Sequence, residues 1–279
     1  MKRKFFYLIL SFLFILIFIN YKVISSAALC GLELFIKKIF PTLFIMIILN
    51  DLLLSSNIIN LFKNKYNYIF FISFLCGSPT NYYIINDLYK NNIIDKKFAN
   101  YYLLTSFFCN PLFLYTILNT IFTKKITIKL LFIHYLTKII INLVFSKNLI
   151  SKNNNNNSKS NINLSLSIKK AVNINLMVMG TIVFYSIISS ILLNTFNMSK
   201  NLEILFKGII EITQGLNCLN NLEQKKKEIY ALLFISFGGI SIHSQIKSIL
   251  NNTNLNYKYF LLGRIFETIL SFIILSCWQ

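Results

Sequence analysis

The sequence predicts an all-α polytopic membrane protein with two related halves, each containing a broken, re-entrant-like helix pair. Three observations support this class. Hydrophobic residues make up 55% of the 279 residues, mean hydropathy is +0.61 and charged residues make up 13%, against about 25% in soluble domains. Apolar runs of helical length alternate with short Lys-rich spacers. Two apolar runs stop at glycine-containing breaks, which membrane proteins tolerate where the backbone lines a protected cavity.

The charge balance is strongly basic, with 28 basic residues, 9 acidic residues and a formal net charge of +19. Most lysines lie between apolar runs, so we interpret them as loop charges that face the cytoplasm or anionic lipid. No basic face alternates with exposed aromatic residues, so nucleic acid is not an expected partner. The five cysteines lie singly without a CxxC spacing, and neither a disulfide framework, a metal nor a cofactor is expected.

Residues 1–26 form the predicted N-terminal membrane anchor. The basic tetrapeptide MKRK precedes an apolar run over 5–19. This fits an uncleaved first membrane helix or a signal peptide cleaved near Ala28. The uncleaved helix is favoured because the rest of the chain is also predicted to be membrane-embedded. The basic start places the N-terminus in the cytoplasm.

The first membrane half is assigned to residues 27–147. An interfacial helix is predicted over 27–38, a span over 40–54 and a closing span over 126–145. A polar linker over 148–166 contains a low-complexity Asn-rich run that cannot bury a core.

The second membrane half is assigned to residues 167–279. It is predicted to contain a long span over 167–193, a connecting helix over 201–222 and a closing span over 257–277.

The first break is Gly77-Ser78-Pro79, between a half-helix over 67–76 and another over 82–89. Each half-helix has about ten residues, roughly 15 Å at 1.5 Å per residue, which is half a bilayer. We therefore predict a hairpin that enters and leaves the membrane from one side, with the break lining a substrate site.

A further interruption follows a helix that Asp95 is predicted to cap. Pro111 removes a backbone donor and frees the carbonyl about four residues earlier. Asn110 beside it either binds substrate or satisfies the groups that the kink exposes.

The segment Gly208–Gly215 is too polar for a lipid-facing helix and too apolar for a loop. Glu211 is then either an acid in an apolar setting, with Thr213 beside it as a further candidate ligand, or a position on a surface helix.

The second break is Gly238-Gly239, which follows the apolar run 229–237. Ser241 and His243 come directly after it, and we expect them to bind substrate rather than to act as a hydrolase.

Four ionisable residues fall within the two closing spans. His134 and Lys138 lie one turn apart on one helix face, and Arg264 and Glu267 have the spacing of an ion pair. Ionisable groups at membrane depth are functional candidates, although Lys138 is near enough to a helix end to extend to the membrane surface.

The tetrapeptide FISF occurs at 71–74 and at 234–237, each time followed by Gly, Ser and an apolar helix. We interpret this as an internal repeat. Paired breaks in two halves indicate the central site of a transporter. The N-termini of the half-helices there suit an anionic group.

These segments resemble the YlbJ (SpoVV) family of sporulation integral membrane proteins, in the nucleoside-recognition or Gate-domain superfamily. The resemblance lies in GSPT at 77–80, DLY at 87–89, FCNPLF at 108–113, EITQG at 211–215 and SFGGISIHSQ at 236–245. It runs in order over nearly the whole chain. It implies a fold similar to nucleoside-transporter Gate domains and adds Gln245 to the expected substrate-binding residues.

The resemblance implies a transport protein of late sporulation that moves dipicolinic acid, a small planar dianion, across the outer forespore membrane of a bacterium. A carrier for a nucleoside or another small metabolite, or a non-transporting scaffold or sensor for spore formation, are the alternatives. An enzyme is not expected, because the sequence has no HExxH, GxSxG or paired-acid constellation. The expected partners are the substrate and the lipid bilayer, and a homo-oligomer is left open.

Overall fold

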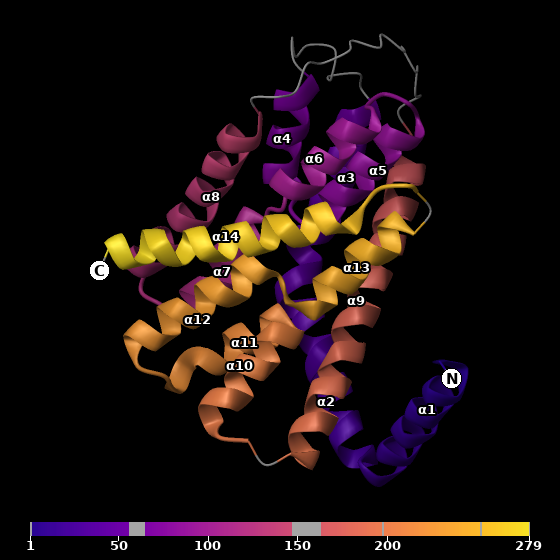
Figure 1. Ribbon diagram of the computed structural model, residues 1–279, viewed down its shortest axis with the longest axis vertical. Helices are drawn as coiled ribbons and strands as arrows, with labels where there is room; N and C mark the ends of the chain where they lie inside the picture. The colour runs from indigo at the N-terminus through magenta and orange to yellow at the C-terminus, as the bar shows by residue number, and fades with distance from the viewer. Residues whose placement is uncertain (1, 56–64, 147–162, 197, 252, 279) are drawn as a thin grey trace.

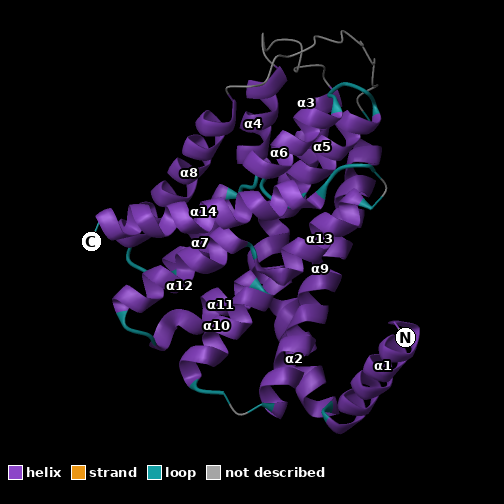
Figure 2. Cartoon of the chain, in the orientation of Figure 1, coloured by secondary structure: helices purple, strands orange, loops and turns teal. Residues whose placement is uncertain are grey.

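The computed structural model describes residues 2–55, 65–146, 163–196, 198–251 and 253–278. Within these ranges the elements are helices joined by short loops, without a strand (Figure 2). Four helical stretches are long and apolar enough to cross a membrane: Lys124–Ser146, Leu164–Thr195, Gln224–Leu250 and Tyr257–Cys277. The predicted all-α class is confirmed, and the four stretches fit a multi-pass membrane protein.

The N-terminal region is more continuous than the sequence predicts. Its elements are α1 (Lys2–Ile19), α2 (Tyr21–Leu34), a π-helical turn (Phe35–Ile39) and α3 (Phe40–Ser55). The predicted interfacial helix over 27–38 is therefore wrong, because α2 continues through the π turn into α3 without a break. The predicted boundary after residue 26 falls inside α2, while α1 lies apart from the bundle in Figure 1.

The remaining helices divide between the two predicted halves. The first half contains α4 (Lys65–Cys76), α5 (Thr80–Lys90), α6 (Lys96–Thr105), α7 (Pro111–Asn119) and α8 (Lys124–Ser146). The second contains α9 (Leu164–Thr195), α10 (Lys200–Ile210), α11 (Ile212–Asn217), α12 (Gln224–Phe237), α13 (Gly239–Leu250) and α14 (Tyr257–Cys277). Most of the predicted linker lies outside the described residues.

The two halves run in opposite directions. The α4/α5 hairpin lies at one end of the bundle and the α10/α11 hairpin at the other (Figure 1). Helix α9 is antiparallel to α2–α3: Ser167 Oγ lies 2.7 Å from Asp51 Oδ2 near one end, and Asn194 Nδ2 lies 2.7 Å from Asn20 Oδ1 near the other. Inverted repeats of this kind are typical of secondary transporters.

The order of elements pairs α4/α5 with α10/α11, and α6/α7 with α12/α13. The two FISF segments therefore lie on elements that do not correspond, since 71–74 belongs to α4 and 234–237 to α12. The alignment of the halves through FISF is wrong. A chain with 27 phenylalanines and frequent isoleucine repeats such a tetrapeptide without structural equivalence.

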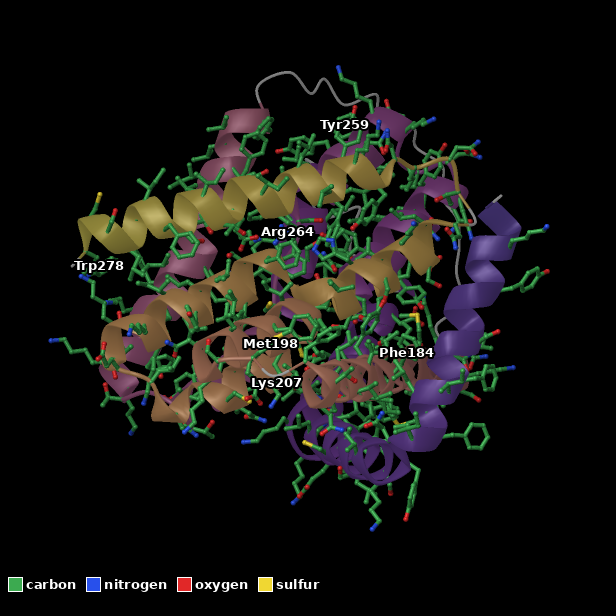
Figure 3. All side chains as sticks on the ribbon, turned by 60° about the horizontal axis from the view of Figure 1, so that its bottom comes forward. Phe184, Met198, Lys207, Tyr259, Arg264 and Trp278 are labelled. Atoms are coloured by element: carbon green, nitrogen blue, oxygen red, sulfur yellow. The ribbon has the colours of Figure 1, made fainter. Side chains whose placement is uncertain are left out.

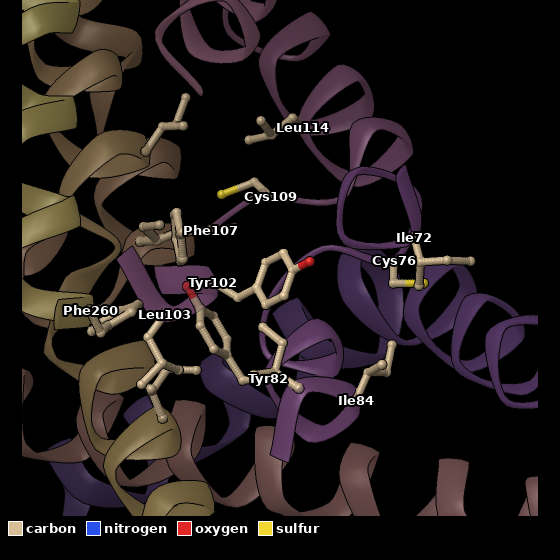
Figure 4. Packing of buried hydrophobic residues seen from close by; sticks show 14 of the residues in the cluster. Ile72, Cys76, Tyr82, Ile84, Tyr102, Leu103, Phe107, Cys109, Leu114 and Phe260 are labelled. Carbon is tan, nitrogen blue, oxygen red and sulfur yellow. The ribbon is translucent and has the colours of Figure 1, made fainter. Parts of the chain in front are cut away.

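The interior contains a cluster of aromatic side chains, and the outer surface of the long helices is apolar. Tyr82, Tyr102, Phe107 and Phe260 are fully buried at the centre (Figure 4). The outward positions of α8, α9 and α14 are exposed and apolar, and they include Ile128, Leu143, Leu176, Phe184, Ile269 and Ile273. Exposed apolar surface on this scale is costly in water and fits a lipid environment.

Small residues allow the half-helices to approach closely. A Cβ on Gly215 of α11 would lie 2.1 Å from the Cα of Gly208 on α10, and a Cβ on Gly208 would lie 2.2 Å from the ring of Phe234. Small residues let membrane helices pack backbone to backbone. The hairpin that carries Glu211 therefore depends on these two glycines.

We expect Gly215→Ala to destabilise the protein by about 1–3 kcal/mol, because the new methyl group meets backbone that cannot move freely. The midpoint of thermal unfolding in detergent measures the effect. Gly180→Ala is the matched control, since Gly180 is exposed on α9 with nothing within 4 Å of a Cβ. Equal midpoints for the two variants would contradict the close approach at Gly215.

Candidate functional site

A cavity of about 60 Å³ lies where four interruptions of helical structure meet. The interruptions are the α4/α5 turn, the loop between α6 and α7, the α10/α11 junction and the start of α13. Seven of the predicted substrate-binding residues line the cavity: Ser78, Pro79, Asn110, Glu211, Thr213, Ser241 and Gln245. Helices α3 and α9 contribute apolar side chains such as Leu43 and Val178, so the lining combines polar and apolar groups.

The first break is held against the α6/α7 interruption. Gly77 has a φ of +69°, and a Cβ there would lie 2.4 Å from the backbone nitrogen of Asn110. Ser78 N donates to the carbonyl of Phe108 at 2.6 Å. Glycine is therefore required at position 77 both for its backbone conformation and for this contact. The two interruptions of the first half form one unit.

Asn110 satisfies the backbone at its break and also lines the cavity. Its Oδ1 accepts hydrogen bonds from Leu112 N at 3.0 Å and Phe113 N at 3.1 Å, which caps the start of α7. Pro111 is the first residue of α7 and does not line the cavity. The side-chain oxygen of Asn110 is therefore engaged in capping.

Glu211 is a buried acid, with 3% of its surface exposed, so the surface-helix alternative is wrong. Its carboxylate accepts from Gln214 N at 2.9 Å and from the hydroxyl of Thr213. It thereby caps α11, and these hydrogen bonds offset the cost of burying the charge. Glu211 and Thr213 reach the cavity together.

The second break bends the chain through two glycines with positive φ, +91° at Gly238 and +64° at Gly239. Neither glycine lines the cavity. Instead, a Cβ at Gly238 would lie 3.1 Å from the Phe107 ring, and one at Gly239 would lie 3.3 Å from the carbonyl oxygen of Ile210. These glycines let the second break pack closely against the α6/α7 loop and the α10/α11 junction.

The start of α13 and the first break supply polar groups that have no protein partner among the described residues. No side chain caps this helix, so the N–H groups of its first turn remain available. Ser241 Oγ, Gln245 Oε1 and Ser78 Oγ are buried and have no hydrogen-bond partner among the described residues. Ser241 is 1% exposed and Gln245 is 2% exposed. Buried polar groups are normally paired, and these three groups are placed to bind a ligand.

His243, predicted as a substrate ligand, does not line the cavity. Its Nδ1 lies 2.5 Å from the Tyr257 hydroxyl and its Nε2 lies 3.0 Å from the carbonyl of Phe237. Ser241 and Gln245 are four residues apart and share one helix face, whereas His243 falls on the opposite face. His243 therefore joins α13 to the end of α12 and the start of α14.

The ionisable residues of the closing spans form one buried cluster. Glu267 of α14 pairs with Lys138 of α8 and with Arg264, and its Oε1 lies 2.9 Å from His134 Nδ1. The expected Arg264–Glu267 pair is present. Lys138 is 0% exposed, so it does not extend to the surface. Figure 3 shows Arg264 in the interior of the bundle.

A separate group of charged side chains forms ion pairs between α3, α5 and α9. Lys170 Nζ lies 2.9 Å from Asp51 Oδ1 and 2.8 Å from Asp87 Oδ2. Lys170 lies at the start of the span predicted over 167–193, and its spacing in the sequence does not predict this contact. Asp51 of α3 therefore takes part in an ion pair between helices.

No protein-family model matches the chain, and neither a curated protein nor a solved structure matches it. The class of protein is therefore inferred from the fold and from the geometry of the cavity. Over the residues that the structure describes, the chain is all-α and has four apolar helical stretches of membrane-spanning length. Its cavity lies at the junction of inverted, broken helix pairs.

Proposed function

We propose that the protein is a membrane carrier that binds a small polar solute in the cavity between the broken helices. The observation that carries this proposal is that Ser78, Ser241 and Gln245 each present to one cavity a buried polar atom that has no partner among the described residues. Leaving a buried donor or acceptor unpaired costs about 1–3 kcal/mol. A bound solute that pairs with these atoms removes that cost.

The inverted arrangement of the halves supports transport rather than simple binding. In secondary transporters, one repeat moves against the other around a site at the repeat interface. Here the cavity takes Ser78 and Asn110 from the first half and Glu211, Ser241 and Gln245 from the second. Relative motion of the halves would open such a site to either side in turn.

Dipicolinate is the first cargo to test, following the resemblance to the YlbJ family. The uncapped start of α13 carries the positive end of a helix dipole and suits a carboxylate. A cavity of about 60 Å³ holds a few water molecules. A planar dicarboxylate is larger than this, so binding requires the halves to separate from this closed arrangement.

A nucleoside is the second cargo, and Glu211 favours it. A buried carboxylate in the cavity lining repels a dianion but accepts hydrogen bonds from sugar hydroxyl groups. The amide of Gln245 can both donate and accept, which suits the edge of a nucleobase.

Uptake into proteoliposomes tests the proposal. The purified full-length chain is reconstituted, and radiolabelled dipicolinate and uridine are supplied in parallel. We expect saturable uptake and counterflow of one of them, with none in protein-free liposomes. Absence of uptake of both solutes would overturn these two cargo assignments and leave a scaffold or sensor as the better interpretation.

A further inference from the structure

The buried cluster of Lys138, Arg264 and Glu267 carries an imbalance of charge. With lysine protonated, two cations face one carboxylate, and each of the three side chains is 0% exposed. Nε and Nη2 of Arg264 have no hydrogen-bond partner among the described residues. The guanidinium lies 3.7 Å from the centroid of the Phe107 ring, and Lys138 Nζ lies 4.8 Å from it. An excess charge at membrane depth is costly.

Lys138 is the group that can remove the imbalance. Arginine stays protonated in proteins, whereas a lysine side chain can exist as an ammonium group or as a neutral amine, so Lys138 is the cation of this cluster whose charge can change. His134 is held neutral by its contacts, because Cys109 N donates to its Nε2 at 3.4 Å while its Nδ1 faces Glu267. Loss of one proton from Lys138 leaves the balanced pair Arg264–Glu267.

The cluster is connected to the second break directly, and to the first break through the α6/α7 loop, whose residues Phe108 and Asn110 contact Ser78 and Gly77. Cys109 lines the cavity, and its N–H is bonded to His134 while its carbonyl accepts from Tyr135 OH at 3.0 Å. Arg264 Nη1 donates to the carbonyl of Ser236 at 3.1 Å, two residues before Gly238. The other titratable groups that face the cluster are Cys109, Tyr82 from α5 and His243 from α13. A change of charge at Lys138 therefore acts on groups that hold both breaks.

The geometry points to Lys138, held by Glu267 and Arg264, as the proton-binding site that couples solute movement to proton movement in the same direction. This inference rests on the proposed carrier function. In the coupling step the ammonium N–H bond breaks, the amine keeps the electron pair, and the proton passes to bulk water on the side to which the carrier is open. An anion in the cavity and a proton on Lys138 stabilise each other, and the coupling is reciprocal.

Reconstituted full-length protein and the variant Lys138→Met test this coupling, with dipicolinate and uridine as probes. With the outside more acidic than the inside, we expect the wild type to accumulate its solute above equilibrium. Lys138→Met leaves a neutral Arg264–Glu267 pair, so we expect it to fold and to exchange solute without a gradient, but to lose acid-driven accumulation. Lys125→Met, at an exposed position of the same helix, is expected to behave as wild type.

The outcomes separate the proton-coupling role of Lys138 from the proposed carrier function. Acid-driven accumulation by Lys138→Met equal to that of wild type would overturn the coupling role. Wild-type exchange that ignores the pH gradient would overturn it while leaving the carrier intact. Absence of any exchange would overturn both for these solutes. If Lys138→Met does not fold, a pH-sensitive dye inside wild-type proteoliposomes tests whether protons move with the solute. Downhill solute entry is expected to acidify the lumen. An unchanged lumen pH would reject the inference.

Discussion

Glu267→Gln is expected to destabilise the protein more than any other single change considered. The substitution keeps the size of the side chain but leaves Lys138 and Arg264 buried without an anion. Removing one partner of a buried ion pair costs about 3–5 kcal/mol. For a chain of this size, such a loss lowers the midpoint of thermal unfolding by roughly 10 °C. Thermal unfolding in detergent, followed by circular dichroism or a thiol-reactive dye, measures the shift.

Two comparisons make this prediction specific. Glu33→Gln removes a carboxylate that pairs with Lys37 on an exposed surface, with 60% and 67% of the two side chains accessible, and should leave the midpoint unchanged. The double variant Lys138→Met with Glu267→Gln should recover part of the loss, because methionine leaves no amine or ammonium group buried without a carboxylate partner. If Glu267→Gln unfolds at the wild-type temperature, the cluster does not carry the buried charges described.

Gln245→Leu is expected to abolish most solute uptake while leaving the fold intact. Gln245 Nε2 bonds to Thr181 Oγ1 at 2.5 Å, and its Oε1 is buried and unpartnered beside the cavity. Leucine has a similar size, so the substitution removes hydrogen bonds without a large void. Loss of a hydrogen bond to a charged solute costs about 1.5–3 kcal/mol, which corresponds to a roughly tenfold to hundredfold loss of affinity.

Initial rates of uptake over a range of solute concentrations separate a binding defect from a folding defect. We expect Gln245→Leu to raise the KM for the solute and to unfold near the wild-type temperature. Ser248→Ala is the matched control, since Ser248 is an exposed residue of the same helix. His243→Gln provides a contrast, because it removes an interhelical contact outside the cavity and should lower stability more than solute affinity. An unchanged KM for Gln245→Leu would remove Gln245 from the site.

Local chemistry determined the helix boundaries well. Asp95 caps α6 as predicted, with Phe98 N donating to its Oδ1 at 2.7 Å. The breaks occur at Gly77 and Gly238 because both positions have positive φ, which glycine adopts without strain. The burial of Glu211 and the pairing of Arg264 with Glu267 were among the alternatives that residue type and spacing raised. The caps, the breaks and the Arg264–Glu267 pair depend on residues close together in the chain, whereas the burial of Glu211 depends on the helices packed around it.

The sequence by itself determined the membrane class, the helix breaks and seven of the sixteen residues that line the cavity. Only the tertiary structure decided how the halves correspond, which way His243 faces and that Lys138 meets Glu267 across 129 positions of the chain. The physical reason is the range of the interactions. A glycine or a capping residue sets the backbone conformation within one helical turn. The orientation of a short half-helix, in contrast, depends on the helices packed around it. For a broken-helix protein, local signals therefore place the interruptions, and long-range packing decides which side chains meet there.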